Sequence, residues 1–222
     1  MKRYGIIGGT FDPIHYAHLY IAYEAQKQLN LDKVIFMPAG KQPLKRENKV
    51  TDSNLRYEMV NMAIEQFEEF SISSYEIEKE GLSFTYETLE YLKENPIENI
   101  IKGGKEYNNF KNNKTEDKEL FFITGADCLM DIEKWRGVSK IFSLCTLVVF
   151  VRGGFNKEDL IKQKNRIEEK YNGKIIVLDL KELEISSTDI RNRVIENKRI
   201  DFFVPPKVVK FIYENKLYTN KD

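Results

Sequence analysis

Two histidines, His15 and His18, lie three residues apart directly after an apolar run that ends in glycines, and the chain of 222 residues contains no others. On the first turn of a helix, residues with this spacing share one face, so both rings can point at the same phosphate group. A neutral imidazole donates a hydrogen bond and a protonated one adds positive charge. Either form stabilises charge that develops on a phosphoryl group. An incidental pair is the weaker interpretation, because random placement would seldom put both histidines here.

The residues before the histidines form a turn that suits an anion. Gly8 and Gly9 let the backbone approach a ligand closely, and Thr10 and Phe11 lead from them toward the helix. Free backbone N–H groups at such a turn and at a helix start bind phosphate. Other phosphate and metal motifs do not fit: the zinc-protease spacing of i and i+4, Gly-x-Gly-x-x-Gly and Gly-Lys-Ser/Thr are all missing from this segment.

A second polar motif lies near the other end of the chain, at the start of a predicted helix. It consists of Ile185, Ser186, Ser187, Thr188 and Arg191. Ser186 with Asp189 has the spacing of a capping box. Hydroxyl and N–H groups at a helix start bind phosphate, and Arg191 can reach the same anion one turn later with its planar set of donors. Taken alone, the motif is more often an ordinary N-cap.

Four further side chains have ordinary structural roles that compete with functional ones. Lys45 lies in a proline-containing basic loop that could simply be solvated. Thr85 could cap a helix. Asp127 follows a strand predicted to end near Gly125 and could accept hydrogen bonds from vicinal hydroxyls. The only tryptophan, Trp135, would most often pack in the core.

Short apolar runs alternate with segments of helical periodicity along the chain. Strands are expected at 4–8, 34–37, 70–77, 120–124, 146–151 and 175–178. Helices are expected at 19–29, 55–67, 85–93 and 160–171, and from near Ser187 and Pro206. This alternation predicts an α/β fold, a doubly wound parallel sheet covered by helices on both faces. Ligands bind such sheets at the carboxyl ends of the strands, where the polar motifs fall.

Composition excludes several classes of protein. Lys plus Arg and Asp plus Glu both number 35, so the basic excess of a protein that binds duplex nucleic acid is missing. No apolar run approaches the ~20 residues that span a bilayer, and no signal peptide is visible. We expect Cys128 and Cys145 to be inert thiols of a cytoplasmic protein. We also expect a single domain over 1–222, in which 100–118 is a surface insertion and 185–222 is a C-terminal helical part.

Both motifs resemble those of a known family. The run GGTFDPIHYAH at 8–18 resembles the H-x-G-H signature of nucleotidyltransferases, in the form found in bacterial nicotinate-nucleotide adenylyltransferases. The run ISSTDIR at 185–191 resembles the I-S-S-T-x-I-R signature of the same family. One position departs from the pattern: Ala17 replaces a glycine, which strains close packing of a ligand without forbidding it. The resemblance runs from Tyr4 to Tyr218, apart from 100–118.

The resemblance implies a Rossmann-like nucleotidyltransferase fold and a reaction. The adenylyl group of ATP would pass to nicotinate mononucleotide, giving nicotinate adenine dinucleotide and pyrophosphate in NAD biosynthesis. His15 and His18 would be catalytic. ATP would be held by Gly8, Gly9, Thr10, Phe11, Gly125, Asp127, Ile185, Ser186, Ser187, Thr188 and Arg191. The mononucleotide would be held by Lys45, Thr85, Trp135 and Arg152, with Trp135 stacked on the pyridine ring and Arg152 at the phosphate. Mg²⁺ would be bound mainly through ATP oxygens, because no carboxylate cluster has a ligand pattern.

Several alternatives stay open. Transferases of the same signature act on pantetheine phosphate, FMN or CTP, and a non-catalytic nucleotide sensor could keep the fold. The segments around Thr85 and Trp135 favour a pyridine ring, and the intact histidines and Arg191 favour catalysis. The bacterial resemblance favours nicotinate over nicotinamide mononucleotide, which the residues themselves do not distinguish. Neither a monomer nor a homo-oligomer is excluded.

Overall fold

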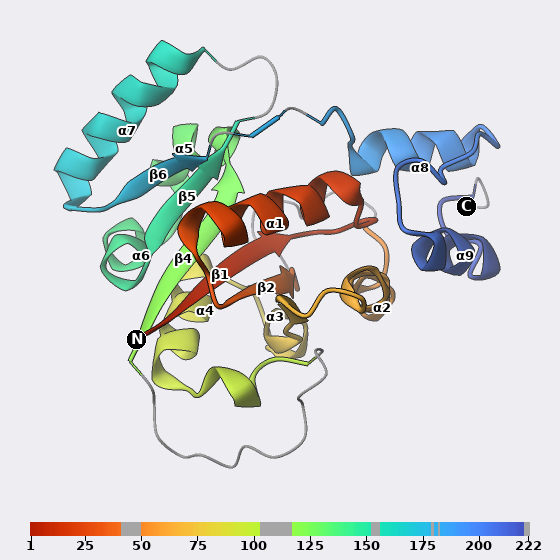
Figure 1. Ribbon diagram of the computed structural model, residues 1–222, viewed down its shortest axis with the longest axis horizontal. Helices are drawn as coiled ribbons and strands as arrows, with labels where there is room; N and C mark the ends of the chain where they lie inside the picture. Colours follow the sequence, from red (N-terminus) through yellow and green to blue (C-terminus); the bar gives the residue numbers. More distant parts are fainter. Residues whose placement is uncertain (41–49, 103–116, 152–155, 179, 182, 220–222) are drawn as a thin grey trace.

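A six-stranded parallel sheet forms the centre of the computed structural model, with helices on both of its faces (Figure 1). The structure describes residues 1–40, 50–102, 117–151, 156–178, 180–181 and 183–219. The strands are β1 (Lys2–Gly9), β2 (Lys33–Pro38), β3 (Phe70–Ile72), β4 (Lys118–Gly125), β5 (Thr146–Phe150) and β6 (Ile175–Leu178). Their order is β3-β2-β1-β4-β5-β6, which confirms the predicted doubly wound sheet.

Alternate residues of each central strand enter two separate apolar clusters, one on each face of the sheet. The helices are α1 (Tyr16–Leu29), α2 (Ser53–Ile64), α3 (Tyr75–Glu78), α4 (Thr85–Glu94), α5 (Ala126–Met130), α6 (Val138–Leu144), α7 (Lys157–Tyr171), α8 (Ser187–Ile195) and α9 (Pro206–Glu214). In β1, Ile7 joins the cluster under α1, α2, α8 and α9, whereas Tyr4 and Ile6 join the cluster under α4, α5, α6 and α7. In the described ranges, none of these helices has the length and apolar character needed to cross a bilayer.

The C-terminal helices pack beside α2 rather than over the sheet centre, at the right of Figure 1. Val208 and Ile212 of α9 are fully buried in the same cluster as Met59 of α2. The loop between α8 and α9 also reaches α1, because the Tyr16 N–H donates to the carbonyl of Phe203 (2.9 Å). This packing brings the second polar motif to the end of β1.

The strand predicted at 70–77 is wrong beyond Ile72, where the chain turns into the short helix α3. The reason is the pair of serines between the two elements. The Ser73 hydroxyl accepts a hydrogen bond from the Tyr75 N–H (3.3 Å), and the Ser74 hydroxyl donates to Glu78 (2.6 Å). Such local side-chain bonds compete with a strand ladder and favour a turn.

The predicted insertion at 100–118 is too wide at both ends. Ile100 and Ile101 are buried in the apolar cluster, and Lys102 forms an antiparallel bridge with Ile72. Lys118 is buried at the first position of β4. The remaining part, 103–116, lies outside the described residues.

Candidate active site

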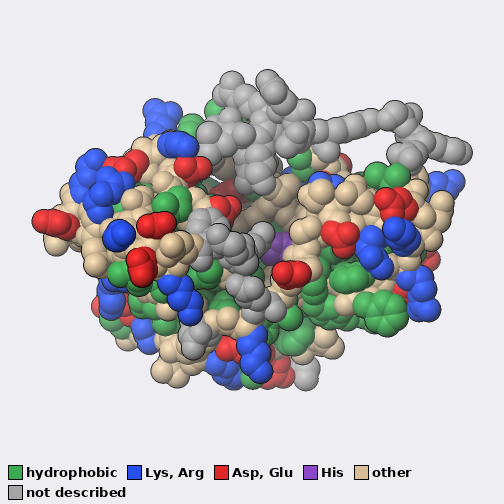
Figure 2. Space-filling view, turned by 90° about the horizontal axis from the view of Figure 1, so that it is seen from above, with side chains coloured by type: hydrophobic (Ala, Val, Ile, Leu, Met, Phe, Trp, Pro, Cys, Tyr) green, Lys and Arg blue, Asp and Glu red, His purple; other side chains and the backbone are tan. Residues whose placement is uncertain are grey.

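The two glycine-ended strands β1 and β4 lie side by side at the switch point of the sheet. Ile7 pairs with Ile123, so Gly9 and Gly125 leave the same edge. After β1 the chain enters α1 on one face, and after β4 it enters α5 on the other. Figure 2 views the molecule from above and shows histidine, in purple, within a hollow of the surface. Where neighbouring strands lead to helices on opposite faces, a crevice opens at their carboxyl ends. Doubly wound sheets bind ligands in this crevice.

The two histidines form a stacked pair at the start of α1. Their ring centroids are 3.7 Å apart with an interplanar angle of 20°. His15 is buried at the N-cap position, and its backbone N–H donates to Nδ1 of His18 at 3.3 Å. Because Nδ1 of His18 accepts this bond, the proton of the neutral ring is on Nε2. The helix start therefore orients His18 as a donor on the side of the ring away from the backbone.

The Phe11 ring shapes the glycine turn by packing against Gly9. Phe11 is buried with a backbone φ of 50°, and its ring lies edge-on to His18 at 5.0 Å. A Cβ on Gly9 would lie 2.9 Å from that ring, so Gly9 is required by packing. Gly8 is exposed, and a Cβ there would meet only the Phe122 ring at 3.5 Å. Of the two glycines, Gly8 thus presents open backbone to a ligand.

A buried arginine that the sequence analysis missed ties this turn to its neighbours. Arg56 of α2 donates from Nη1 to the carbonyl of Thr10 (2.7 Å), from Nη2 to Ala39 (2.8 Å) and from Nε to Thr51 (2.9 Å). Burial lowers the pKa of its guanidinium, while the carboxylate of Asp12 raises it. Its position beside an apolar helical stripe gave no signal, because Arg on such a stripe usually reaches solvent.

The second motif contacts the first directly. Ser187 Oγ donates to the carbonyl of Pro13 (2.8 Å), and Arg191 Nη1 donates to the carbonyl of Asp12 (2.7 Å). Arg191 Nη2 also donates to the Thr188 hydroxyl at 3.2 Å. Two motifs at opposite ends of the sequence therefore lie together at the end of β1.

The remaining residues of the second motif have structural contacts. The Ser186 hydroxyl caps α8 by accepting from the Asp189 N–H (3.1 Å), as the spacing predicted. Ile185 packs partly against the apolar cluster. The motif thus presents the hydroxyl of Thr188, the Arg191 guanidinium and the first N–H groups of α8 beside the turn.

Trp135 packs on the opposite face of the sheet from α1, against Phe122. It is half-buried, and its ring meets Phe122 edge-on at 6.0 Å, the same ring that Gly8 faces. Thr85 is the first residue of α4, and Phe84 takes the N-cap position in its place, so the predicted threonine cap is wrong. The Arg136 guanidinium lies 5.0 Å from the centroid of the Phe84 ring, so the residue after Trp135 contacts the start of α4.

Asp127 covers the end of β4. A Cβ on Gly125 would lie 2.3 Å from Asp127 Oδ1, so this exposed carboxylate folds back over the glycine. Two other predicted contacts, Lys45 and Arg152, lie outside the described residues. Within the described residues, no group of three or more His, Cys, Asp or Glu side chains could hold a metal ion.

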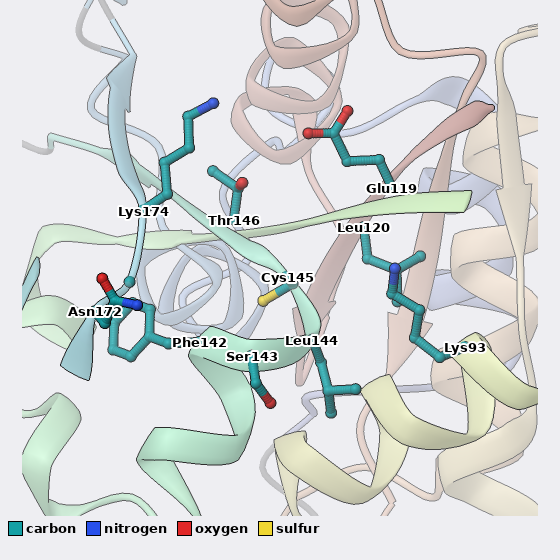
Figure 3. A pocket seen from close by; sticks show the side chains of 11 residues that line it. Lys93, Glu119, Leu120, Phe142, Ser143, Leu144, Cys145, Thr146, Asn172 and Lys174 are labelled. Atoms are coloured by element: carbon teal, nitrogen blue, oxygen red, sulfur yellow. The ribbon is translucent and has the colours of Figure 1, made fainter. Parts of the chain in front are cut away.

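A cavity of about 270 Å³ lies at the amino ends of the strands, away from the histidines (Figure 3). It is lined by residues at the amino ends of β4 and β5, among them Leu120, Cys145 and Thr146. Burial raises the pKa of the Cys145 thiol to about 12, which makes it unreactive, as the sequence analysis expected. This cavity is separate from the crevice that holds the histidines.

Known proteins match this chain over nearly its whole length. The chain matches the cytidylyltransferase-like family model over residues 6–193. It is 68% identical over 218 residues to a probable nicotinate-nucleotide adenylyltransferase of Clostridium beijerinckii, across 98% of this chain and 100% of that protein. A protein of the same description from Clostridium perfringens is 51% identical, across 98% of both chains. These similarities confirm the family resemblance drawn from the two motifs.

A solved structure supports the fold. Plasmodium falciparum nicotinic acid mononucleotide adenylyltransferase complexed with NaAD matches with a TM-score of 0.71, across 98% of both chains. The sequences are 20% identical, so this likeness bears on the fold alone. It confirms the predicted nucleotidyltransferase architecture.

Proposed function

Because the chain belongs to the nicotinate-nucleotide adenylyltransferase family, we propose that it joins ATP to nicotinate mononucleotide, giving nicotinate adenine dinucleotide and pyrophosphate in NAD biosynthesis. One observation carries the proposal beyond family membership. The stacked histidines, the open Gly8 and the Arg191 motif meet at the switch point of the sheet. This arrangement offers donors to a phosphate chain and adds an aromatic wall at Trp135.

The reaction forms one bond and breaks another at the α-phosphorus of ATP. A phosphate oxygen of the mononucleotide attacks, the bond to the bridging oxygen of the β-phosphate breaks, and pyrophosphate leaves with that electron pair. A phosphate monoester is already an anionic nucleophile, so the site has to position and stabilise charge rather than remove a proton. His18 Nε2–H, oriented by the His15 backbone, donates to oxygens on which charge develops.

The second motif is suited to hold the β- and γ-phosphates. The first N–H groups of α8 and the Thr188 hydroxyl point from a helix start, where anions are stabilised. Arg191 uses two of its five N–H donors on Asp12 and Thr188, which leaves others for a phosphate. Mg²⁺ enters with ATP as part of that substrate, coordinated mainly by phosphate oxygens.

The pyridine nucleotide is proposed to lie between the start of α4 and Trp135. The Trp135 ring supplies a stacking surface, and the N–H groups at the start of α4 suit a carboxylate on the pyridine ring. Lys45 and Arg152 are the predicted contacts of its phosphate. The use of ATP fits the predicted cytoplasmic location, and so does the absence of a disulfide at Cys128 and Cys145.

Isotopic labels test this assignment and its nearest rival. With Mg²⁺ and nicotinate mononucleotide, label in the α-phosphate of ATP should appear in the dinucleotide, and label in the γ-phosphate should appear in pyrophosphate. CTP in place of ATP should give at most a small fraction of that product. Label transfer from CTP at an equal or higher rate would make the protein a cytidylyltransferase instead.

A further inference from the structure

Tyr218 follows α9 and reaches the turn that holds the histidines. Its hydroxyl donates to Asp12 Oδ1 at 2.7 Å and lies 4.0 Å from Sδ of Met59. The tyrosine backbone has a φ of 61°, in the left-handed region that residues with a Cβ seldom adopt. Contacts must hold it there, and the bond to Asp12 is one of them.

Asp12 is the residue at which four segments meet. Its Oδ1 accepts from Tyr218, and its Oδ2 accepts from the Thr51 N–H at the start of α2 (3.3 Å). Its backbone carbonyl accepts from Arg191 of α8 (2.7 Å), while the histidine pair begins three residues later. The Asp12 side chain is buried, so its position is set by these donors and not by solvent.

We propose that Tyr218 is a positioning residue for adenylyl transfer. By holding the Asp12 carboxylate, its hydroxyl fixes the backbone that receives Arg191 and leads into His15. The inference rests on the proposed function. Tyr218 acts through Asp12 and not by contact with a phosphate. Burial and the Asp12 carboxylate raise the pKa of the tyrosine, so the hydroxyl keeps its proton and stays a donor at neutral pH.

Tyr218→Phe removes the hydroxyl and keeps the ring. Tyr213→Phe is the matched control, because Tyr213 is on α9 but 49% exposed. Turnover and both KM values are measured well below the unfolding temperature, per folded molecule. Histidine side-chain resonances are recorded in parallel, since the chain has only two histidines. Asp12→Ala, alone and combined with Tyr218→Phe, tests whether the tyrosine acts through Asp12.

We expect Tyr218→Phe to lower kcat by roughly tenfold and to shift both histidine resonances, with the KM for nicotinate mononucleotide within about twofold. Tyr213→Phe should match the wild type, and Tyr218→Phe should cost little more in the Asp12→Ala background. Unchanged kcat per folded molecule, together with unchanged histidine resonances, would overturn the inference. A wild-type protein without activity would instead contradict the proposed function, and the resonances would still test Tyr218. If Asp12→Ala does not fold, the single Tyr218 variant decides.

Discussion

The imidazole of His18 is aimed by its own helix start, because the His15 N–H occupies Nδ1 and leaves Nε2 as the donor. We expect His18→Ala to lower kcat about a hundredfold or more, since one well-placed donor supplies roughly 3 kcal/mol of transition-state stabilisation. Pyrophosphate release at saturating substrates measures this loss. The kcat of His18→Asn, which keeps an N–H donor, should lie between those of the wild type and His18→Ala. Near-normal turnover of a folded His18→Ala protein would remove the histidine from the mechanism.

Arg56 is a single side chain that contributes to stability rather than to catalysis. Its three bonds go to backbone carbonyls of Thr10, Ala39 and Thr51. Arg56→Leu leaves these carbonyls without their charged donor, so the free energy of unfolding should fall by roughly 3 kcal/mol. Urea titration measures it, and the exposed Arg199→Ala is the control, with no expected change. Equal stability of the two variants would mean that solvent replaces the lost bonds.

Helix α8 is held to the histidine turn by Ser187 and Arg191. Arg191→Lys keeps the charge but not the planar fork that joins Asp12 to Thr188. We expect the KM for ATP to rise about tenfold while the KM for nicotinate mononucleotide stays within about twofold. Arg193→Lys on the same helix is the matched control. The Arg193 side chain donates to the backbone carbonyl of Arg199 and lies over the Phe203 ring, so it does not contact the histidine turn in the way that Arg191 does. Equal rises in both KM values would indicate general loosening of the site.

Most elements could be predicted from the sequence because their apolar periods are regular, as in β1 and α1. The strand at 70–77 failed because Ser73 and Ser74 end the ladder with local bonds that a period of two does not reveal. The candidate site divides similarly. Histidines and hydroxyl clusters are visible in the sequence, whereas Arg56 and Tyr218 resemble ordinary helix and loop residues until the fold brings Arg56 to Thr10 and Tyr218 to Asp12.

At the scale of the whole molecule, stability should depend on pH through the partly buried carboxyl of Glu76. Burial raises its pKa above the ordinary 4.5, although the Thr88 hydroxyl donates to it at 2.8 Å. The folded state then binds more protons than the unfolded state, so this group's stabilisation is complete below pH 4.5 and is lost as pH rises through the folded pKa. Glu76→Gln should therefore gain stability relative to the wild type as pH rises above 4.5.

Glu133→Gln provides a control of opposite sign for that series of unfolding measurements. Hydrogen bonds from Arg166 and Lys170 lower the pKa of Glu133 to about 2, so its contribution is present above 4.5 and is lost as pH falls toward 2. A difference between Glu76→Gln and the wild type that stays constant from acid to neutral pH would contradict the account of Glu76. The single-domain organisation remains a prediction from the sequence, which leaves both a monomer and a homo-oligomer open.

Adenylyl transfer to nicotinate mononucleotide is tested most directly by pyrophosphate release from ATP and Mg²⁺, with nicotinate mononucleotide and nicotinamide mononucleotide in parallel reactions. We expect fast release with the nicotinate form and much slower release with the nicotinamide form. The difference would come from the ring carboxylate at the start of α4. Release with neither acceptor would contradict the proposed function and return pantetheine phosphate, FMN and the sensor alternative to consideration.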